Sequence, residues 1–205
     1  MPATEKEIVH AVADAIIANK DYLTELDTKI GDGDHGINMA RGFEAVVEAV
    51  DKMEDTTDLV ALFNTIGHTL LETVGGASGP LYGTGFIQAA KAVEPHPPMT
   101  VANVEKVLGA VIEGIKHRGR ADKGDKTMLD VLIPIREALK NSAGKSLIEV
   151  LMNASVAANK GLEYTKTIAA KRGRASYIGD RSIGTEDPGA ASSLIMFRAF
   201  VTALR

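Results

Sequence analysis

The hydrophobic positions of this chain recur mainly at helical spacing. Near the N-terminus, Thr4 and Glu7 stand three residues apart, the spacing of a capping box. One helical face then carries the apolar residues Ile8, Val9, Val12, Ile16 and Ile17. Similar patterns predict a short segment at 22–26 and helices over 39–50, 58–74, 81–93, 101–119, 128–139, 147–169 and 190–204. No run shows sustained period-two alternation, so the pattern predicts an all-α fold.

Three glycine-rich stretches interrupt the helical pattern. They cover residues 27–38, residues 75–79 with Gly83 and Gly85 beyond them, and residues 171–189. A compact helical domain does not need loops of this length merely to reverse direction. We therefore expect these stretches to form the functional surface. A separate stretch, 94–99, holds three prolines in six residues and predicts a linker or turn.

Composition narrows the classes of partner and site. The chain has 205 residues, which favours one domain spanning residues 1–205. Its net charge of −4 argues against nucleic acid and anionic membranes as partners. The absence of cysteine excludes disulfides and thiolate metal sites, and it fits a cytoplasmic protein. No apolar run is long enough to predict a signal peptide or a membrane span.

The first interrupted stretch concentrates negative charge. Asp27, Asp32 and Asp34 fall within eight residues, and only Gly33 separates the last two. In an extended backbone their side chains would leave on the same side, with Cα atoms roughly 7 Å apart. Clustered carboxylates repel one another and raise one another's pKa unless a cation lies among them. Because oxygen ligands without cysteine suit hard cations, the stretch predicts a magnesium or calcium site.

These residues also suggest other interpretations. An EF-hand counted from Asp32 fails, because its twelfth position is Phe43 where a bidentate Glu is required. The residues alone leave open a solvated acidic turn in which Asn38 caps the next helix. They also leave open a basic solvated turn at Arg174 and a core position for Met128. The sequence suggests no role for the four histidines other than His35, which are His10, His68, His96 and His117.

Four longer blocks carry a family resemblance. They are GDGDHGINMARGF (31–43), GGASGPLYGTGF (75–86), GDKTMLD (124–130), and GRASYIGDRSIG with DPGA (173–190). In this order they resemble the ADP-binding L subunit of dihydroxyacetone kinase, also called glycerone kinase. The resemblance implies an antiparallel eight-helix barrel with the nucleotide site at one rim.

The resemblance also implies a set of site residues. Asp27, Asp32 and Asp34 would hold two Mg²⁺ ions against the diphosphate of a tightly bound ADP. The nucleotide itself would be contacted by His35, Gly36, Ile37, Asn38, Ala77, Ser78, Gly119, Met128 and Arg174, under a late loop of Asp187, Pro188 and Gly189. One departure bears on that loop: Thr185 and Glu186 stand where many members have His-Gln.

The function implied by the resemblance is a phosphoryl relay. ADP would be phosphorylated by a phosphohistidine on a multiphosphoryl donor protein, and the ATP formed would phosphorylate dihydroxyacetone held on a separate K subunit. The length of the chain favours this phosphoenolpyruvate-dependent type, because ATP-dependent members carry both domains in one polypeptide. Two alternatives remain: a subunit that exchanges ATP freely and serves another small ketose or polyol, and a non-catalytic module that binds a transcription regulator. Oligomeric state, ketone preference and the metal used in the cell are not predicted.

Overall fold

The computed structural model describes residues 3–142 and 144–205. Nine α-helices and one 3-10 helix follow one another within these ranges. They are α1 (Glu5–Ala18), α2 (Lys20–Ile30), α3 (His35–Asp51), α4 (Leu59–Thr73), α5 (Ser78–Ala92), α6 (Val101–Gly119), α7 (Leu129–Lys140), α8 (Leu147–Thr165), η1 (Arg174–Ser182) and α9 (Pro188–Ala203). The prediction of an all-α fold is confirmed for this described part of the chain, where no strand occurs.

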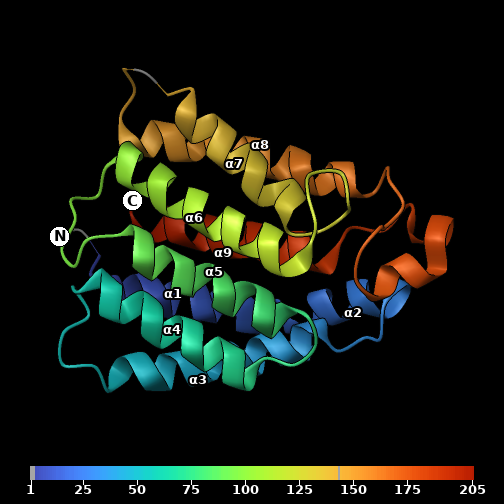
Figure 1. The fold of residues 1–205 in the computed structure, drawn as a ribbon, viewed down its shortest axis with the longest axis horizontal. Coiled ribbons are helices and arrows are strands. Elements are labelled where there is room, and N and C mark those ends of the chain that lie inside the picture. The colour runs from blue at the N-terminus through green and yellow to red at the C-terminus, as the bar shows by residue number, and fades with distance from the viewer. Residues whose placement is uncertain (1–2, 143) are drawn as a thin grey trace.

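Eight of the helices close into a barrel. From α3 to α9 each helix packs against the next, α1 packs against α3, and α9 returns to pack against α1. The helices run roughly side by side along the long axis of the molecule (Figure 1). The ninth helix, α2, extends beyond α1 and lies with η1 at one end, opposite the first turn of α1 and the last turn of α9 (Figure 1). The expected eight-helix barrel is therefore confirmed, and its rim at the α2 end carries the two segments outside the ring.

Side-chain caps fix where several barrel helices begin. Thr4 forms the predicted capping box with Glu7 at the start of α1. Asp58 accepts hydrogen bonds from two backbone N–H groups of α4, and Thr100 accepts one from α6. Ser146 forms a second capping box at α8. Each cap satisfies N–H groups that have no partner within the helix, so these starts follow from local sequence.

The barrel interior is apolar. A continuous core joins buried residues of the ring helices, among them Phe43, Leu70, Ile115, Ile135 and Leu151. A hollow of about 310 Å³ lies among apolar side chains of α1, α3, α4, α5, α6 and α9. In the part of the chain that the structure describes, no helix is long and apolar enough to cross a membrane.

Several predicted boundaries were wrong: some helices extend into glycine-containing residues that read as loop, and α8 ends earlier than predicted. The stretch 27–38 is mostly helical, because α2 runs to Ile30 and α3 begins at His35. Gly83 and Gly85 lie inside α5. A Cβ atom on Gly83 would lie 2.8 Å from the Gly67 carbonyl oxygen of α4, so glycine permits the close approach of these two helices. The late stretch 171–189 contains η1, and α8 ends at Thr165 rather than near residue 169.

Candidate nucleotide and metal site

The acidic turn between α2 and α3 is built around the Asp27 carboxylate. Asp27 lies in the last turns of α2, and Gly33 turns the chain back with a φ of 74°. The Asp27 Oδ2 atom accepts hydrogen bonds from the backbone N–H groups of Asp34 at 2.9 Å and His35 at 3.1 Å. Asp34 occupies the N-cap position of α3, but its own side chain makes no capping bond. The carboxylate of the preceding helix therefore caps α3.

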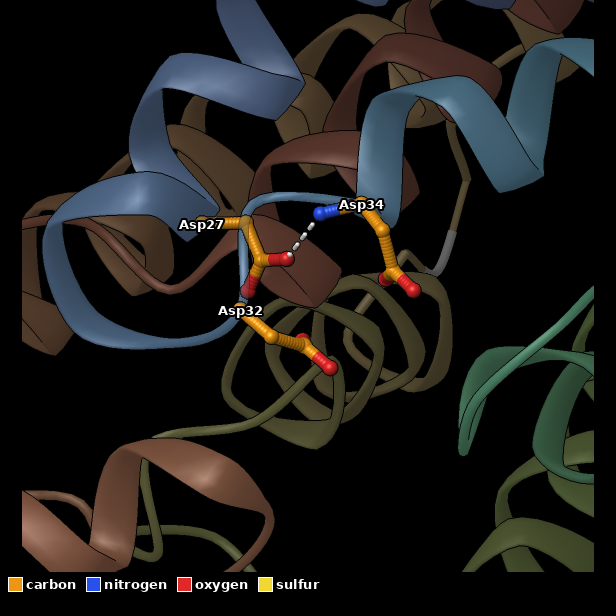
Figure 2. A group of neighbouring side chains, drawn as sticks. All are labelled: Asp27, Asp32 and Asp34. Carbon is orange, nitrogen blue, oxygen red and sulfur yellow. Dashed lines mark hydrogen bonds between the residues drawn. The ribbon is translucent and has the colours of Figure 1, made fainter.

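This turn brings the three predicted metal ligands together. One carboxylate oxygen from each of Asp27, Asp32 and Asp34 lies within 4.8 Å of the other two. Figure 2 shows the three side chains grouped around the turn, with the bond from the Asp34 N–H to Asp27. The extended backbone expected at 32–34 is wrong, because Gly33 adopts a left-handed conformation. The side chains converge through this turn rather than through strand-like alternation.

The donor set of the cluster fits a hard divalent cation. All the converging atoms are carboxylate oxygens, the ligands preferred by magnesium and calcium. The cluster already forms an ion pair with one positively charged side chain: Arg174 Nε lies 2.8 Å from Asp32 Oδ2. Both of these side chains remain open to solvent, so the pair is a weak one and does not close the cluster to a cation.

A cavity of about 290 Å³ lies beside the cluster. It is bounded by the start of α5, the end of α6, the 118–128 segment, and the segments on both sides of η1. Nine of the twelve residues expected to contact nucleotide line it: His35, Ala77, Ser78, Gly119, Met128, Arg174, Asp187, Pro188 and Gly189. Residues from four distant parts of the sequence therefore meet at one rim of the barrel.

His35 joins the acidic cluster to the cavity. Its backbone N–H is bound by Asp27, and its side chain is buried. The ring Nδ1 lies 3.0 Å from Ser78 Oγ, and Nε2 lies 3.0 Å from Ser192 Oγ. Burial lowers the pKa of His35, which favours the neutral imidazole. A neutral ring donates through one nitrogen and accepts through the other, so the two serines fix its orientation.

The remaining three predicted contacts lie outside the cavity lining. Gly36 packs against α2, where an added Cβ atom would lie 2.0 Å from the Lys20 carbonyl oxygen. Ile37 is 50% exposed. Asn38 is buried and its Oδ1 accepts a hydrogen bond from Arg41 at 2.7 Å. These positions place all three near the acidic turn, with no lining contact to the 290 Å³ cavity among the described residues.

Two features of the 124–130 block escaped sequence reasoning. Lys126 lines the cavity with only 1% of its surface exposed, and it has a φ of 61°. Its ammonium donates to the carbonyl oxygens of Thr165 and Thr185, which tie this loop to α8 and to the segment before α9. Asp130 is also buried and accepts bonds from the N–H groups of two loop residues. A lysine in a glycine-containing loop gives no sequence signal of burial, since its partners are 39 and 59 residues away.

Asp187 forms part of the cavity wall and caps α9. Its Oδ2 accepts a bond from the Ala190 N–H at 2.8 Å. Burial raises the pKa of Asp187 to about 7, although the backbone N–H of Ala190 and the charge of Lys126 both oppose this. Desolvation dominates because the carboxyl faces the protein more than solvent. The charge of this wall therefore changes near neutral pH.

Comparison with known proteins identifies relatives of the whole chain. The family model described as the DAK2 domain matches residues 29–202. The ADP-binding subunit DhaL of the PEP-dependent dihydroxyacetone kinase of Escherichia coli K12 is 42% identical over 194 residues, covering 94% of this chain and 92% of that subunit. The corresponding subunit of kinase 1 of Listeria innocua is 45% identical over 183 residues, covering 89% of this chain and 87% of that subunit.

The fold is also similar to solved structures. The dihydroxyacetone kinase of C. freundii, crystallised in complex with AMP-PNP and Mg²⁺, matches with a TM-score of 0.78 and 27% sequence identity. The match covers 98% of this chain and 34% of that kinase, so the chain spans about a third of its length. Since the family model and the relatives extend across the barrel and its rim, the chain belongs to the DAK2 domain family.

Proposed function

We propose that this chain is the ADP-binding subunit of a PEP-dependent dihydroxyacetone kinase and that residues 1–205 act as one nucleotide-binding domain. The observation that carries the proposal is the meeting of three carboxylates with a cavity lined by nine of the residues that the family resemblance implies. Similarity to the Escherichia coli and Listeria innocua subunits over about nine-tenths of each chain supports the same class. The chain is accordingly a phosphotransferase subunit.

The three carboxylates are the proposed ligands of two Mg²⁺ ions. When bound, such ions would neutralise phosphate charge, which is most of what phosphoryl transfer requires of a protein. Asp27 is held by two backbone N–H groups, so its position is fixed before any ligand arrives. Arg174 lines the cavity while contacting Asp32, which puts a guanidinium where phosphate and carboxylate charge would meet.

The rest of the cavity suits the remainder of a nucleotide. Ser78 lies at the first position of α5, where the unpaired N–H groups of a helix favour phosphate. Gly119 and Met128 line the cavity together with Leu81 and Ile115 and offer apolar surface to a base. Pro188 and Gly189 also line it, and a Cβ on Gly189 would lie 3.5 Å from Met128 Cε. We infer that Gly36, Ile37 and Asn38 act on phosphate through the shape of the acidic turn.

The proposed relay has two transfers. A phosphohistidine of a multiphosphoryl donor protein loses its phosphoryl group to the terminal phosphate of ADP. The ATP formed loses that γ-phosphoryl group to a hydroxyl of dihydroxyacetone held on a K subunit, which gives dihydroxyacetone phosphate and returns ADP. In this scheme the nucleotide stays bound throughout, and the subunit works in the cytoplasm with these two protein partners.

Calorimetry tests the metal and nucleotide site. Nucleotide-stripped protein should take up ADP when Mg²⁺ is present and lose this uptake in excess chelator. Asp32→Asn should weaken the uptake by at least about tenfold, since even outer partners of metal sites are worth that much. Asp14→Asn is the matched control, because Asp14 is an exposed aspartate of α1 outside the cluster. Folded wild-type protein without Mg²⁺-dependent ADP uptake would refute the proposal.

Retention of the nucleotide separates the proposal from its nearest rival. Mass analysis of gently purified protein should find one ADP per chain after desalting, and a phosphohistidine donor should convert it to ATP without release. Free exchange with added ATP, with full turnover on a K subunit, would favour an ATP-exchanging kinase subunit. Absence of turnover with any K subunit would favour a regulatory module.

A further inference from the structure

The segment 184–189 covers the last part of the connection between η1 and α9 and the first two residues of α9, and it lines the cavity through Asp187, Pro188 and Gly189. Other lining residues come from α5, α6 and the loop before α7. Up to Asp187 the segment is loop, and the η1 before it is a short 3-10 helix. Such elements open locally at lower cost than packed α-helices, so this wall is the one expected to move when a ligand leaves.

Glycine stands on both sides of η1. Gly173 has a φ of 65° and Gly184 a φ of 94°, and neither has a heavy atom within 4 Å of the position where a Cβ would stand. No atom packs closely at the Cβ position of either glycine, and one backbone hydrogen bond ties Gly184 to Lys166. Further restraint on the wall comes from the residues beyond Gly184.

Glu186 supplies a restraint that reaches two helices. Only 12% of its side chain is exposed. One carboxylate oxygen accepts a hydrogen bond from the Tyr22 hydroxyl of α2, and the other lies 3.0 Å from the Lys166 ammonium just after α8. Burial raises the pKa of Tyr22, and the Glu186 carboxylate raises it further, so the hydroxyl keeps its proton and donates it. Bonds to an ionised acceptor are about twice as strong as neutral ones.

The bond to Tyr22 differs from the other bonds of this segment. Gly184 donates to the Lys166 carbonyl oxygen at 2.8 Å, and Asp187 donates to Thr165 Oγ1 at 3.0 Å. Both of those bonds lead to the end of α8, while Lys126 donates to the Thr185 carbonyl oxygen and Tyr82 of α5 donates to that of Gly189. Among the hydrogen bonds described for residues 184–189, the one from Tyr22 leads to α2, the helix that carries Asp27 five residues later.

We propose that Glu186 is a positioning residue that fastens the wall at 184–189 to α2 and α8 and thereby slows release of the bound nucleotide. This proposal rests on the proposed function, because it requires ADP in the cavity. It gives a role to a position where the chain departs from the His-Gln of many members. A glutamate there can bind a hydroxyl and an ammonium at once, whereas a neutral glutamine offers one acceptor oxygen and no charge.

Release kinetics test the clamp. Wild-type protein would be loaded with a fluorescently labelled ADP in Mg²⁺ and mixed with excess unlabelled ADP. Tyr22→Phe removes one hydroxyl and should speed release about tenfold, the lower bound for a bond to a charged group. Glu186→Gln should speed it by a similar factor. The double variant should release no more than about twofold faster than the faster single variant, because both changes act on the same charge-assisted bond.

The matched control is Glu163→Gln. Glu163 also pairs with Lys166, at 3.0 Å, but it lies on α8, and none of the hydrogen bonds or ion pairs described joins it to the segment 184–189. This variant should release ADP within about twofold of wild type, as expected for an exposed pair. Association rates should stay within about twofold for all variants, since a clamp acts after binding.

The outcomes separate the clamp from the function on which it rests. Wild-type protein that binds labelled ADP, with Tyr22→Phe and Glu186→Gln both releasing it at the wild-type rate, would overturn the clamp alone. Equal slowing of association would mean that the changes damage the site, and this too would overturn it. If Glu186→Gln does not fold, Tyr22→Phe decides, because it deletes one oxygen from a half-exposed side chain. Wild-type protein that binds no ADP would instead refute the proposed function.

Discussion

Gly36 gives the sharpest test of how the acidic turn is held. It lies in the first turn of α3, buried against α2. A Cβ atom built there would stand 2.0 Å from the Lys20 carbonyl oxygen and 2.4 Å from Thr24 Oγ1. Because ordinary contacts begin at 3.4 Å, Gly36→Ala would force α2 and α3 apart by about 1.4 Å. The nearest obstacle is backbone, which cannot rotate away as a side-chain tip can.

The magnitude follows from overpacking. Inserting one methyl group into a tight site costs about 1–3 kcal/mol, and a backbone obstacle points to the upper part of that range. Alanine regains about 1 kcal/mol of helix propensity over glycine, which offsets part of the cost. For a chain of this size the net change of about 1–2 kcal/mol corresponds to a lowering of Tm by roughly 2–8 °C. Separation of α2 from α3 would also pull Asp27 from the N–H groups that it caps, so ADP uptake should weaken.

Differential scanning calorimetry and ADP titration of Gly36→Ala would measure both effects. Gly85→Ala is the control, since it lies in α5 and its Cβ would meet a movable Val111 side chain at 3.1 Å. We expect the control to melt within about 2 °C of wild type, because the gain in propensity balances a small displacement. If Gly36→Ala melts and binds ADP like wild type, the close contact of α3 with α2 does not exist as described.

Two further predictions concern carboxylates. In nucleotide-free protein, Asp187 has a folded-state pKa of about 7 against an ordinary value of 3.8, so its stabilising contribution is complete below pH 4 and is lost as pH rises through 7. Urea unfolding should show that Asp187→Asn becomes more stable relative to wild type as pH rises from 5 to 8. The gain in unfolding free energy should stay below roughly 4 kcal/mol, because Asp187 keeps partial exposure. A difference that does not depend on pH would contradict this prediction. Asp27→Ala removes the cap of α3 and should lower the unfolding free energy by about 1–2 kcal/mol. Asp32→Ala should change it by less than about 0.5 kcal/mol. Equal losses for the two variants in chemical denaturation would refute the assignment of the cap to Asp27.

The sequence predicts those helix starts whose caps are local. Thr4, Asp58 and Thr100 each lie within three residues of the N–H groups that they bind. The start of α3 was missed because its cap comes from Asp27, seven and eight residues earlier and on another helix. No window of apolar periodicity contains that information. The glycines of the turn then read as loop, although Gly36 is helical because α2 leaves no room for a side chain.

The candidate site was likewise predictable only in part from the sequence. The family resemblance indicated nine residues that the fold gathers around one cavity, because its sequence blocks recur in a known order. Lys126 and Glu186 went unassigned, since their significance depends on partners far away in the chain. A charged residue is exposed by default, and only the folded chain shows which ones are buried and paired.

The Asp27 carboxylate joins folding to chemistry at this rim. Capping α3 uses Oδ2, while Gly31 leaves space for Oδ1, because a Cβ at that position would lie 2.2 Å from it. The cluster is therefore partly assembled by the same bonds that begin α3, so a cation would find one ligand already ordered rather than three mobile side chains. Preorganisation of this kind lowers the entropic cost of binding. It also means that selection for a stable α2–α3 junction and selection for a metal site act on the same residue, which ties the geometry of the turn to the chemistry that we propose for it.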